Sequence, residues 1–236
     1  MVSAMLDEIP LRGGRVTHGI VRVGDTVRRP PTANSEFVLL LLQHLAAKGF
    51  NGAPAALGTD EAGRDVLTFI DGDVPPDLGF YEDRTLREAA SLIRRYHDAT
   101  AELLASPAAA ATGIEVVCHN DLSPCNFVFR GGVPSALIDF DAAAPGTRAH
   151  DLGYAAWLWL NLGSPEITAG DQWRRLTLFL NAYGHRDRAS VLAAVVKRQA
   201  ILVAQGRRIG DEAMTVWAAD CLDWTRRNLM SSAAGP

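Results

Sequence analysis

The sequence contains little cysteine and no long apolar run. Its 236 residues include three cysteines, too few and too unevenly spaced for a disulfide framework, so we expect reduced thiols. The longest apolar runs, such as residues 37–42 and 155–160, are far shorter than the roughly 18 residues that a membrane-spanning helix needs. Residues 1–10 carry two acids and lack the apolar core of a secretory signal. These absences predict a soluble, cytoplasmic protein without a membrane partner.

Long runs of like charge are also missing. The formal net charge is −4, and no basic stripe of the kind that nucleic-acid binders show is present. We therefore expect no nucleic-acid partner, whereas a mild acidic excess leaves room for a cationic small substrate. What is present is an ordinary globular balance of 48% hydrophobic and 21% charged residues, in a chain long enough to bury a substantial core.

The first third of the sequence predicts strands and one helix. Residues 22–27 form two β-prone runs joined by Gly24-Asp25, which is typical of a tight hairpin. Residues 35–48 are rich in leucine and predict a helix that stops at Gly49. Residues 65–70 are extended again, and the Asp-Gly and Pro-Pro pairs that follow predict a linker near residues 71–77.

The rest of the sequence is predominantly helical. Thr85 and Glu88 have capping-box spacing at the start of a predicted helix. One face of that helix is expected to be buried because its members recur at helical spacing: Leu86, Ala89, Ala90, Ile93 and His97. Apolar pieces at 127–129 and 136–138 predict a second hairpin, and residues 150–227 are helical with breaks at 163–165 and 184–185. This order predicts an α+β fold with a small lobe, residues 1–72, and a larger helical lobe, residues 73–236.

Polar side chains gather at one end of the second predicted hairpin. Asp121 and Asn126 precede its first strand, and Asp139 leaves its second strand. Because the two strands are antiparallel, we expect these side chains to meet although Asp139 is 18 residues from Asp121. Carboxylate and amide oxygens suit Mg²⁺, and Asp121 would remain free to accept the proton of an attacking hydroxyl.

This segment resembles the catalytic and metal-binding segments of the protein-kinase-like superfamily, most closely the aminoglycoside phosphotransferase and choline kinase branch. Residues 119–126, His-Asn-Asp-Leu-Ser-Pro-Cys-Asn, match the pattern H-x-D-x-x-x-x-N and are called the catalytic loop below. Residues 138–141, Ile-Asp-Phe-Asp, match I-D-F/W-[DE], and Asp-Leu-Gly at 151–153 looks like the D-L-A that opens the next helix in that branch. A true protein kinase is disfavoured because HRD, DFG and APE are absent.

The resemblance implies a two-lobed, protein-kinase-like fold with a small antiparallel sheet in the N-terminal lobe. It implies ATP and Mg²⁺ as cofactors, Asp121 as the catalytic base, and Asn126 and Asp139 as metal ligands. It also implies that His119 and Asp151 support the catalytic loop.

The expected nucleotide site departs from the usual glycine motif. Gly14 and Gly19 do not complete G-x-G-x-x-G, although Val21 fits the valine that packs on adenine in the kinase loop. In a two-residue hairpin Val21 lies opposite Arg28, so both side chains share a face of the sheet. We therefore prefer Arg28 to Arg29 as the phosphate-gripping residue, in place of the usual lysine.

Two further parts of the nucleotide site are expected by resemblance. Glu36 would be the acid on the following helix that pairs with Arg28, although its place in a first helical turn is equally explained by the helix dipole. Residues Thr68, Phe69 and Ile70 would form the hinge whose backbone meets the base. No side chain there separates ATP from GTP.

The phosphoryl acceptor would bind between the catalytic loop and the C-terminal helices. Asp141, Asp220 and Asp223 are candidate acids for an amine-bearing substrate, and all five tryptophans lie in the same half of the chain. For any one of these residues, a place in the core or on a solvated helix face is the simpler explanation.

The combined pattern predicts an ATP- and Mg²⁺-dependent phosphotransferase acting on a small-molecule hydroxyl. Its acceptor would be an aminoglycoside, another antibiotic-like compound or an amino alcohol, with antibiotic resistance as one role. A nucleotide-binding pseudokinase with a regulatory or scaffolding role is the alternative, since the glycine loop is imperfect and the lysine is missing. A metal-dependent hydrolase using His119, Asp121 and Asp139 would need more ligand histidines than this segment offers.

Overall fold

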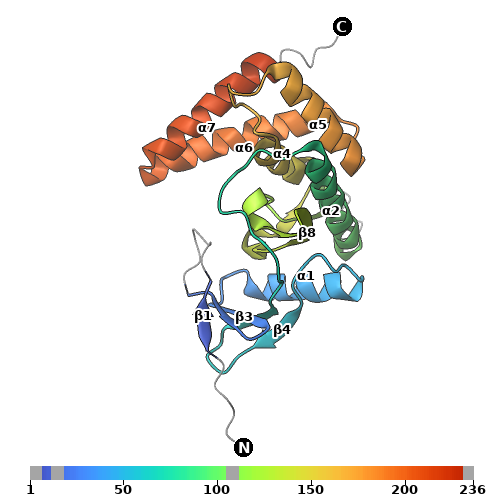
Figure 1. The fold of residues 1–236 in the computed structure, drawn as a ribbon, viewed down its shortest axis with the longest axis vertical. Helices are drawn as coiled ribbons and strands as arrows, with labels where there is room; N and C mark the ends of the chain where they lie inside the picture. The colour runs from blue at the N-terminus through green and yellow to red at the C-terminus, as the bar shows by residue number, and fades with distance from the viewer. Residues whose placement is uncertain (1–6, 12–18, 105–111, 231–236) are drawn as a thin grey trace, which may run out of the picture.

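The computed structural model describes residues 7–11, 19–104 and 112–230. Its N-terminal part is a five-stranded antiparallel sheet in the order β1-β2-β3-β5-β4, with one helix, α1, beside it (Figure 1). The bounds of these elements are β1 (Glu8–Pro10), β2 (Val21–Val23), β3 (Thr26–Arg29), α1 (Ser35–Ala47), β4 (Ala56–Thr59) and β5 (Asp65–Thr68).

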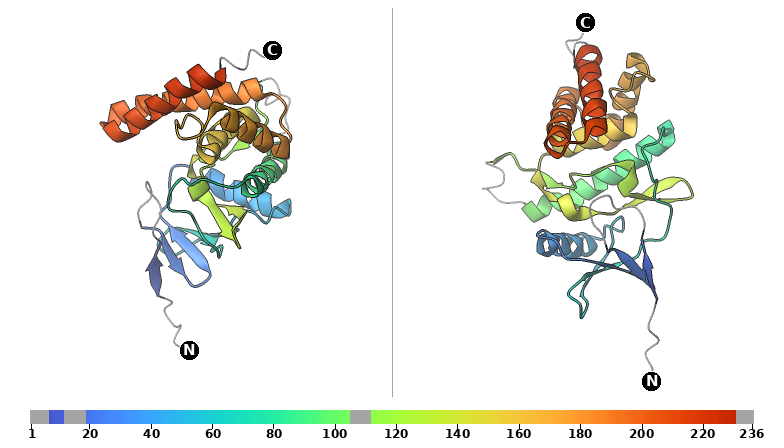
Figure 2. Two further views of the ribbon diagram at one scale, coloured as in Figure 1. Left: turned by 45° about the horizontal axis from the view of Figure 1, so that its top comes forward. Right: turned by 90° about the vertical axis from the view of Figure 1, so that its left-hand side faces the viewer.

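The C-terminal part is mostly helical and lies beyond α1, as the three ribbon views show (Figures 1 and 2). Two small antiparallel strand pairs, β6–β9 and β7–β8, lie between the N-terminal sheet and the last helices. The bounds are α2 (Asp83–Ala101), β6 (Val116–Cys118), β7 (Phe127–Arg130), β8 (Val133–Leu137), β9 (Ala144–Gly146), α4 (Arg148–Leu160), α5 (Ala169–Tyr183), α6 (Arg188–Ile209) and α7 (Glu212–Thr225). The predicted α+β, two-lobed kinase-like architecture is confirmed.

Local sequence signals placed most elements correctly. The first hairpin has the expected register, with Val23 opposite Thr26 and Val21 opposite Arg28. Helix α1 ends before Gly49, whose φ of 71° supplies the left-handed turn that glycine favours. The helix face expected to be buried on α2 is fully buried, with Ile93 and His97 both at 0% exposure.

Three features of the secondary structure differ from the sequence predictions. The capping box at Thr85 and Glu88 is wrong, because α2 already begins at Asp83 and Thr85 lies inside it. The pair β6–β9 and the break at Gly210 between α6 and α7 were not predicted. A capping-box match needs only two residue types at one spacing, so the preceding turn of helix decides whether it is used.

One continuous hydrophobic core joins the two ends of the molecule. It includes Leu42 of α1, Ile93 of α2 and Trp159 of α4, all at 0% exposure. The expected linker is tied to this body, because Asp73 and Phe129 exchange two backbone hydrogen bonds of 2.9 and 2.7 Å. The division of the chain at residue 72 stays a prediction.

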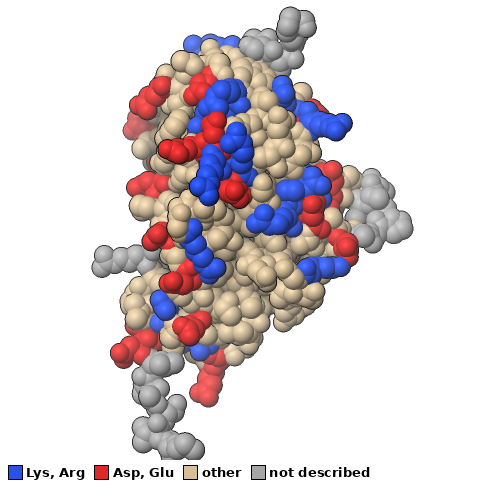
Figure 3. All heavy atoms as spheres, turned by 45° about the vertical axis from the view of Figure 1, so that its right-hand side comes forward, with Lys and Arg blue, Asp and Glu red and all other residues tan. Residues whose placement is uncertain are grey.

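The distribution of charged side chains and the state of the cysteines match what the sequence led us to expect. On the face shown in Figure 3, Lys and Arg side chains lie among Asp and Glu side chains and form no single-sign stripe. The three cysteines are free. No helix within the described ranges combines the length and the apolar character that crossing a membrane requires.

Candidate active site

The start of the catalytic loop is held by a buried carboxylate from α4. Asp151 accepts hydrogen bonds from the backbone N–H groups of His119 and Asn120, both at 2.8 Å, and lies 3.0 Å from the Nε2 of His97. Burial is the largest single influence on the pKa of Asp151 and raises it. His97, through its hydrogen bond and charge, and His119, through its charge and backbone hydrogen bond, outweigh burial, so the net effect is a lowered pKa. The carboxylate is therefore ionised and fixes the loop backbone.

His119 ties the catalytic loop to the end of β8. Its ring is fully buried, and Nε2 donates to the backbone carbonyl of Ile138 at 3.0 Å, since a carbonyl can only accept. The next residue, Asn120, has a φ of 65°, a left-handed conformation that places the following side chain on a sharp turn. The geometry gives His119 a supporting role and leaves Asp121 as the partly exposed acid of the loop.

The β7–β8 hairpin brings the expected metal ligands to one end. Phe127 pairs with Leu137, so the residues just before β7 and just after β8 are neighbours. Asn126 accepts a backbone hydrogen bond from Ile138 at 3.0 Å, and its side-chain amide donates to the carbonyl of Asp121 at 2.9 Å. The prediction that the hairpin gathers Asp121, Asn126 and Asp139 thus has a structural basis in the strand pairing.

Asp139 is in an environment that favours a neighbouring cation. Its φ is 64°, and burial, followed by the charge of Asp141, raises the pKa of its carboxyl, whereas the charge of Arg29 lowers it. In the described part of the chain, no group of three His, Cys, Asp or Glu side chains is arranged to hold a metal. A set of one carboxylate and one amide nevertheless fits Mg²⁺, which usually takes few protein ligands and completes its shell with phosphate oxygens and water.

Strand β3 contributes an arginine other than the one that the sequence favoured. Arg29, 6% exposed, forms an ion pair with Asp141 and lies opposite Asp65 on the neighbouring strand, whereas Arg28 is half-buried and shares its face with Val21. The hairpin register was predicted correctly. Arg29, on the opposite face of β3, is the arginine that contacts the segment after Asp139, and the role of Arg28 as the phosphate grip stays a prediction.

The start of α1 is attached to the same segment. The side-chain amide of Asn34 donates to the carbonyls of Asp141 and Ala143 at 2.9 and 3.0 Å. Ser35 donates to Asp65 at 2.5 Å, which links α1 to β5. Together with the Arg29–Asp141 ion pair, these bonds join the sheet side of the site to the residues that follow Asp139.

The other expected nucleotide contacts receive less support. Glu36 is exposed, and among the described side chains no ion pair joins it to Arg28. Gly14 lies outside the described residues, and Gly19 has a φ of 82°. At the predicted hinge, the N–H groups of Thr68 and Phe69 already donate to the carbonyls of Ala55 and Asp25. Ile70 follows them directly, and the contact of this hinge with a base stays a prediction.

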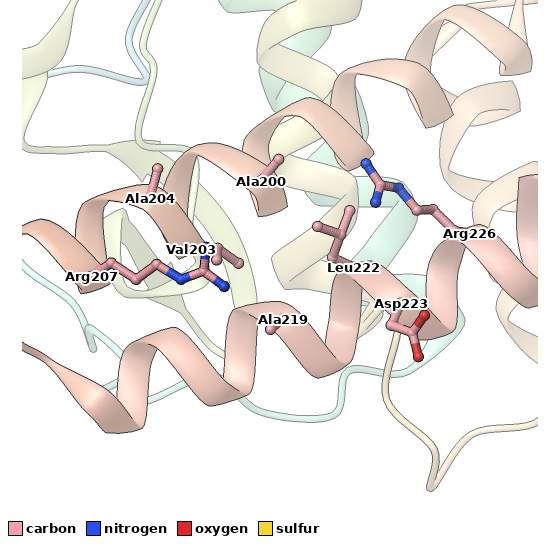
Figure 4. Close-up of a pocket in the computed structure, with 8 residues that line it drawn as sticks. All are labelled: Ala200, Val203, Ala204, Arg207, Ala219, Leu222, Asp223 and Arg226. Atoms are coloured by element: carbon pink, nitrogen blue, oxygen red, sulfur yellow. The ribbon is translucent and has the colours of Figure 1, made fainter.

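The candidate acceptor acids are not brought together. Asp141 is engaged by Arg29, Asp220 is exposed, and Asp223 pairs with Arg227 at 2.6 Å. Asp223 lies beside a groove of about 330 Å³ between α6 and α7 (Figure 4), whose lining residues are Ala200, Val203, Ala204, Arg207, Ala219, Leu222, Asp223 and Arg226. The role of these three acids in acceptor binding stays a prediction.

The tryptophans of this half divide between core and surface. Trp157 and Trp159 are buried, and Trp217 is 42% exposed while it stacks on Trp157 with ring centroids 5.0 Å apart. Trp159 also donates its indole N–H to the carbonyl of Leu122 in the catalytic loop at 3.1 Å. The buried pair is therefore structural, and Trp159 helps to fix the loop.

Four residues near the site carried no role in the sequence interpretation: Arg29, Asn34, Tyr154 and Arg198. Tyr154 follows Asp151 by three positions and so shares its helix face, which is a signal that spacing alone could have supplied. Arg198 is 47 residues further along than Asp151, and nothing in its surroundings in the sequence connects it to the loop.

Comparison with known proteins assigns the family. The model of the phosphotransferase enzyme family matches residues 75–192, which is half of the chain. The trifolitoxin immunity protein of Rhizobium leguminosarum bv. trifolii is 37% identical over 175 residues, which cover 69% of this chain and 66% of that protein. The chain thus spans about two thirds of that relative's length.

Solved structures at low sequence identity show the same fold. The GDP complex of aminoglycoside 2′-phosphotransferase-IIIa has a TM-score of 0.60 at 15% identity, covering 95% of this chain and 94% of that one. Choline kinase LicA from Streptococcus pneumoniae also has a TM-score of 0.60, at 14% identity, covering 96% and 94%. With the family model matching the segment that contains the catalytic loop, the chain belongs to the phosphotransferase enzyme family.

Proposed function

We propose that the protein transfers the γ-phosphoryl group of ATP to a hydroxyl of a small molecule, with Mg²⁺ as the metal. The observation that carries this proposal is the arrangement at the end of the β7–β8 hairpin. There, the backbone N–H of Ile138 donates to the carbonyl of Asn126, and the Asn126 side chain donates to the carbonyl of Asp121. Asp139 directly follows Ile138, so the pairing of β7 with β8 brings both acids to the same end of the hairpin. Phosphoryl transfer needs positioning and charge neutralisation more than covalent chemistry. This arrangement supplies Asp121 to position the hydroxyl, and Asn126 and Asp139 to hold the cation that would neutralise the phosphate charge.

Each side chain has a distinct task in this proposal. Asp121 is the partly exposed acid that orients the acceptor hydroxyl and takes its proton as the oxygen attacks the γ-phosphorus. The bond from that phosphorus to the β,γ-bridging oxygen breaks in the same transfer, and ADP leaves. Asn126 and Asp139 would hold the Mg²⁺, which supplies positive charge for the phosphate oxygens. His119 and Asp151 hold the loop in place through the bonds described above.

Arg29, rather than Arg28, is our candidate for the phosphate grip on β3. Arg29 is buried, ion-paired with Asp141, and close enough to influence Asp139. An arginine at this place can bind phosphate oxygens through two parallel N–H groups, which a lysine cannot do. We infer ATP as the donor from the family pattern, and the structural neighbour solved as a GDP complex makes GTP the natural competitor to test.

For the acceptor, we favour an antibiotic-like compound over an amino alcohol. Support comes from the 37% identical relative, whose name describes immunity to trifolitoxin, and from the aminoglycoside phosphotransferases that share the fold. In this proposal the protein modifies the compound in the cytoplasm, where ATP is present, and thereby confers resistance.

The proposal is tested by a substitution and an acceptor screen. Purified protein with Mg-ATP is incubated with hydroxylated antibiotics, amino alcohols and sugars, and ADP formation and product mass are measured. Asp121→Asn is expected to lower turnover by about 10²- to 10⁴-fold while ATP binding is retained. The matched control is Asp98→Asn, an exposed acid of α2 paired with Arg94 and Arg148, which should leave turnover unchanged.

Two results would count against the proposal. Wild-type turnover in Asp121→Asn would remove Asp121 from the chemistry. Nucleotide binding without product for any acceptor class would favour the pseudokinase alternative.

A further inference from the structure

Arg198 of α6 reaches across to the catalytic loop. Its guanidinium donates to the backbone carbonyl of Asn120, the residue directly before the proposed base. The same guanidinium lies over the ring of Tyr154, 4.2 Å from the ring centroid. A cation over an aromatic face is attracted to it, and stacking holds the planar group in one orientation. One side chain therefore bridges α6, α4 and the loop.

Tyr154 continues this arrangement to Asp121 itself. Its phenol lies close enough to Asp121 for the two side chains to interact. Burial, and then the charge of Asp121, raise the pKa of the Tyr154 phenol, so the hydroxyl keeps its proton and can act as a donor to that carboxylate. A carboxylate has about four acceptor positions, so a bond from Tyr154 would leave others free for an acceptor hydroxyl.

A glycine permits the helix approach on which these contacts depend. A Cβ placed at Gly153 would lie 2.5 Å from the Cβ of Ala194 and 2.9 Å from its carbonyl carbon. So α4 and α6 approach more closely at this point than a residue with a Cβ would allow. Arg198 follows Ala194 by one helical turn and Tyr154 follows Gly153 directly, so the close approach sets the distance between them.

We propose that Tyr154 and Arg198 are positioning residues for the catalytic carboxylate, held in register by the Gly153–Ala194 contact. Tyr154 binds one side of the Asp121 carboxylate and so selects its orientation, while Arg198 prevents the preceding peptide from rotating. The inference rests on the proposed function, in which Asp121 is the base. It assigns a role in turnover to two residues that lie outside the loop motif.

The groove of Figure 4 supplies a matched control on the same helix. Arg207 lines that groove with Ala200 and Ala204 (Figure 4). Residues 198 and 200 are roughly 200° apart around the helix axis, so the loop and the groove lie on different faces of α6. Arg207→Ala therefore removes a guanidinium from α6 without touching the loop. Tyr96→Phe is the control for tyrosine, because its buried hydroxyl has no hydrogen-bond partner.

The kinetic test compares Tyr154→Phe and Arg198→Ala with these controls, using the acceptor found in the screen. Loss of a hydrogen bond to a charged group is expected to lower kcat by about 10- to 100-fold, with the KM for ATP within about twofold of wild type. Arg198→Lys should recover part of the loss, because it restores a donor for Asn120 but not the planar stack. Gly153→Ala should lower kcat in the same way while Tyr154 and Arg198 are intact.

A second readout is independent of activity. Hydrogen exchange of the loop amides, residues 119–126, should be faster in Arg198→Ala than in wild type and unchanged in Arg207→Ala. The proposal is overturned if kcat in Tyr154→Phe and Arg198→Ala stays within twofold of wild type while Asp121→Asn abolishes turnover. If Asp121→Asn is fully active, the proposed function fails instead. In that case, unchanged hydrogen exchange of the loop amides in Arg198→Ala would overturn the positioning role as well.

Discussion

Replacing Asp151 by alanine is expected to destabilise the protein strongly, because this carboxylate is the fully buried anchor of the catalytic loop. Three hydrogen bonds of 2.8 to 3.0 Å reach it, from His97 and from the backbone of His119 and Asn120. Removing one partner of a buried charged network costs about 3–5 kcal/mol, since the remaining groups stay buried and unpaired. For a chain of this size, each kcal/mol lowers Tm by about 2–4 °C, so we expect a fall of about 6–20 °C.

The assay is thermal and urea unfolding of Asp151→Ala beside Asp98→Ala. Asp98 is an exposed acid that pairs with Arg94 and Arg148 at the surface, so its loss should cost no more than about 1 kcal/mol. The two substitutions remove the same chemical group, and only burial and bonding differ. Equal unfolding free energies for the two variants would refute the view that Asp151 is an ionised, hydrogen-bonded anchor.

The stability difference between wild type and Asp151→Ala is expected to depend on pH. The pKa of Asp151 is lowered in the folded protein, so its stabilising contribution is fully present above the unfolded value of about 3.9 and is lost as pH falls through the folded value. The stability difference between wild type and Asp151→Ala should therefore be largest near neutral pH and shrink below about pH 4. A difference that grows on acidification would contradict the direction of the pKa shift.

Two further predictions follow from the contacts around the site. Arg29→Ala should raise the KM for ATP by about tenfold or more, whereas Arg28→Ala should change it by less than about threefold, because Arg29 contacts Asp141 in the acidic segment. A larger effect of Arg28→Ala in nucleotide titrations would favour Arg28 as the phosphate-gripping residue instead. Gly72→Ala should destabilise by more than Gly131→Ala in urea unfolding. Its φ of 144° alone costs about 1–3 kcal/mol, and a Cβ lying 2.5 Å from the carbonyl oxygen of Phe129 adds a steric clash to that cost. Gly131→Ala, where a Cβ meets nothing within 4 Å, should cost about 1–2 kcal/mol, and equal losses would contradict the importance of the Phe129 contact.

The sequence by itself determined the parts of the site that depend on short-range geometry. Gly24-Asp25 fixed the register that places Val21 opposite Arg28, and the spacing of apolar residues fixed the buried face of α2. The loop pattern at 119–126 and the hairpin after it placed Asn126 beside the residues that lead to Asp139. These features follow from backbone periodicity within a few residues, which a single sequence contains.

Only the tertiary structure decided which faces meet. Alternation along β3 separates Arg28 from Arg29, but only packing of the sheet against the segment after β8 shows that Arg29 meets Asp141. Likewise, the contact of Arg198 with Asn120 depends on how closely α6 approaches α4 at Gly153. Such contacts join residues far apart in the chain, and their geometry is set by how the sheet and the helices pack, which local spacing does not encode.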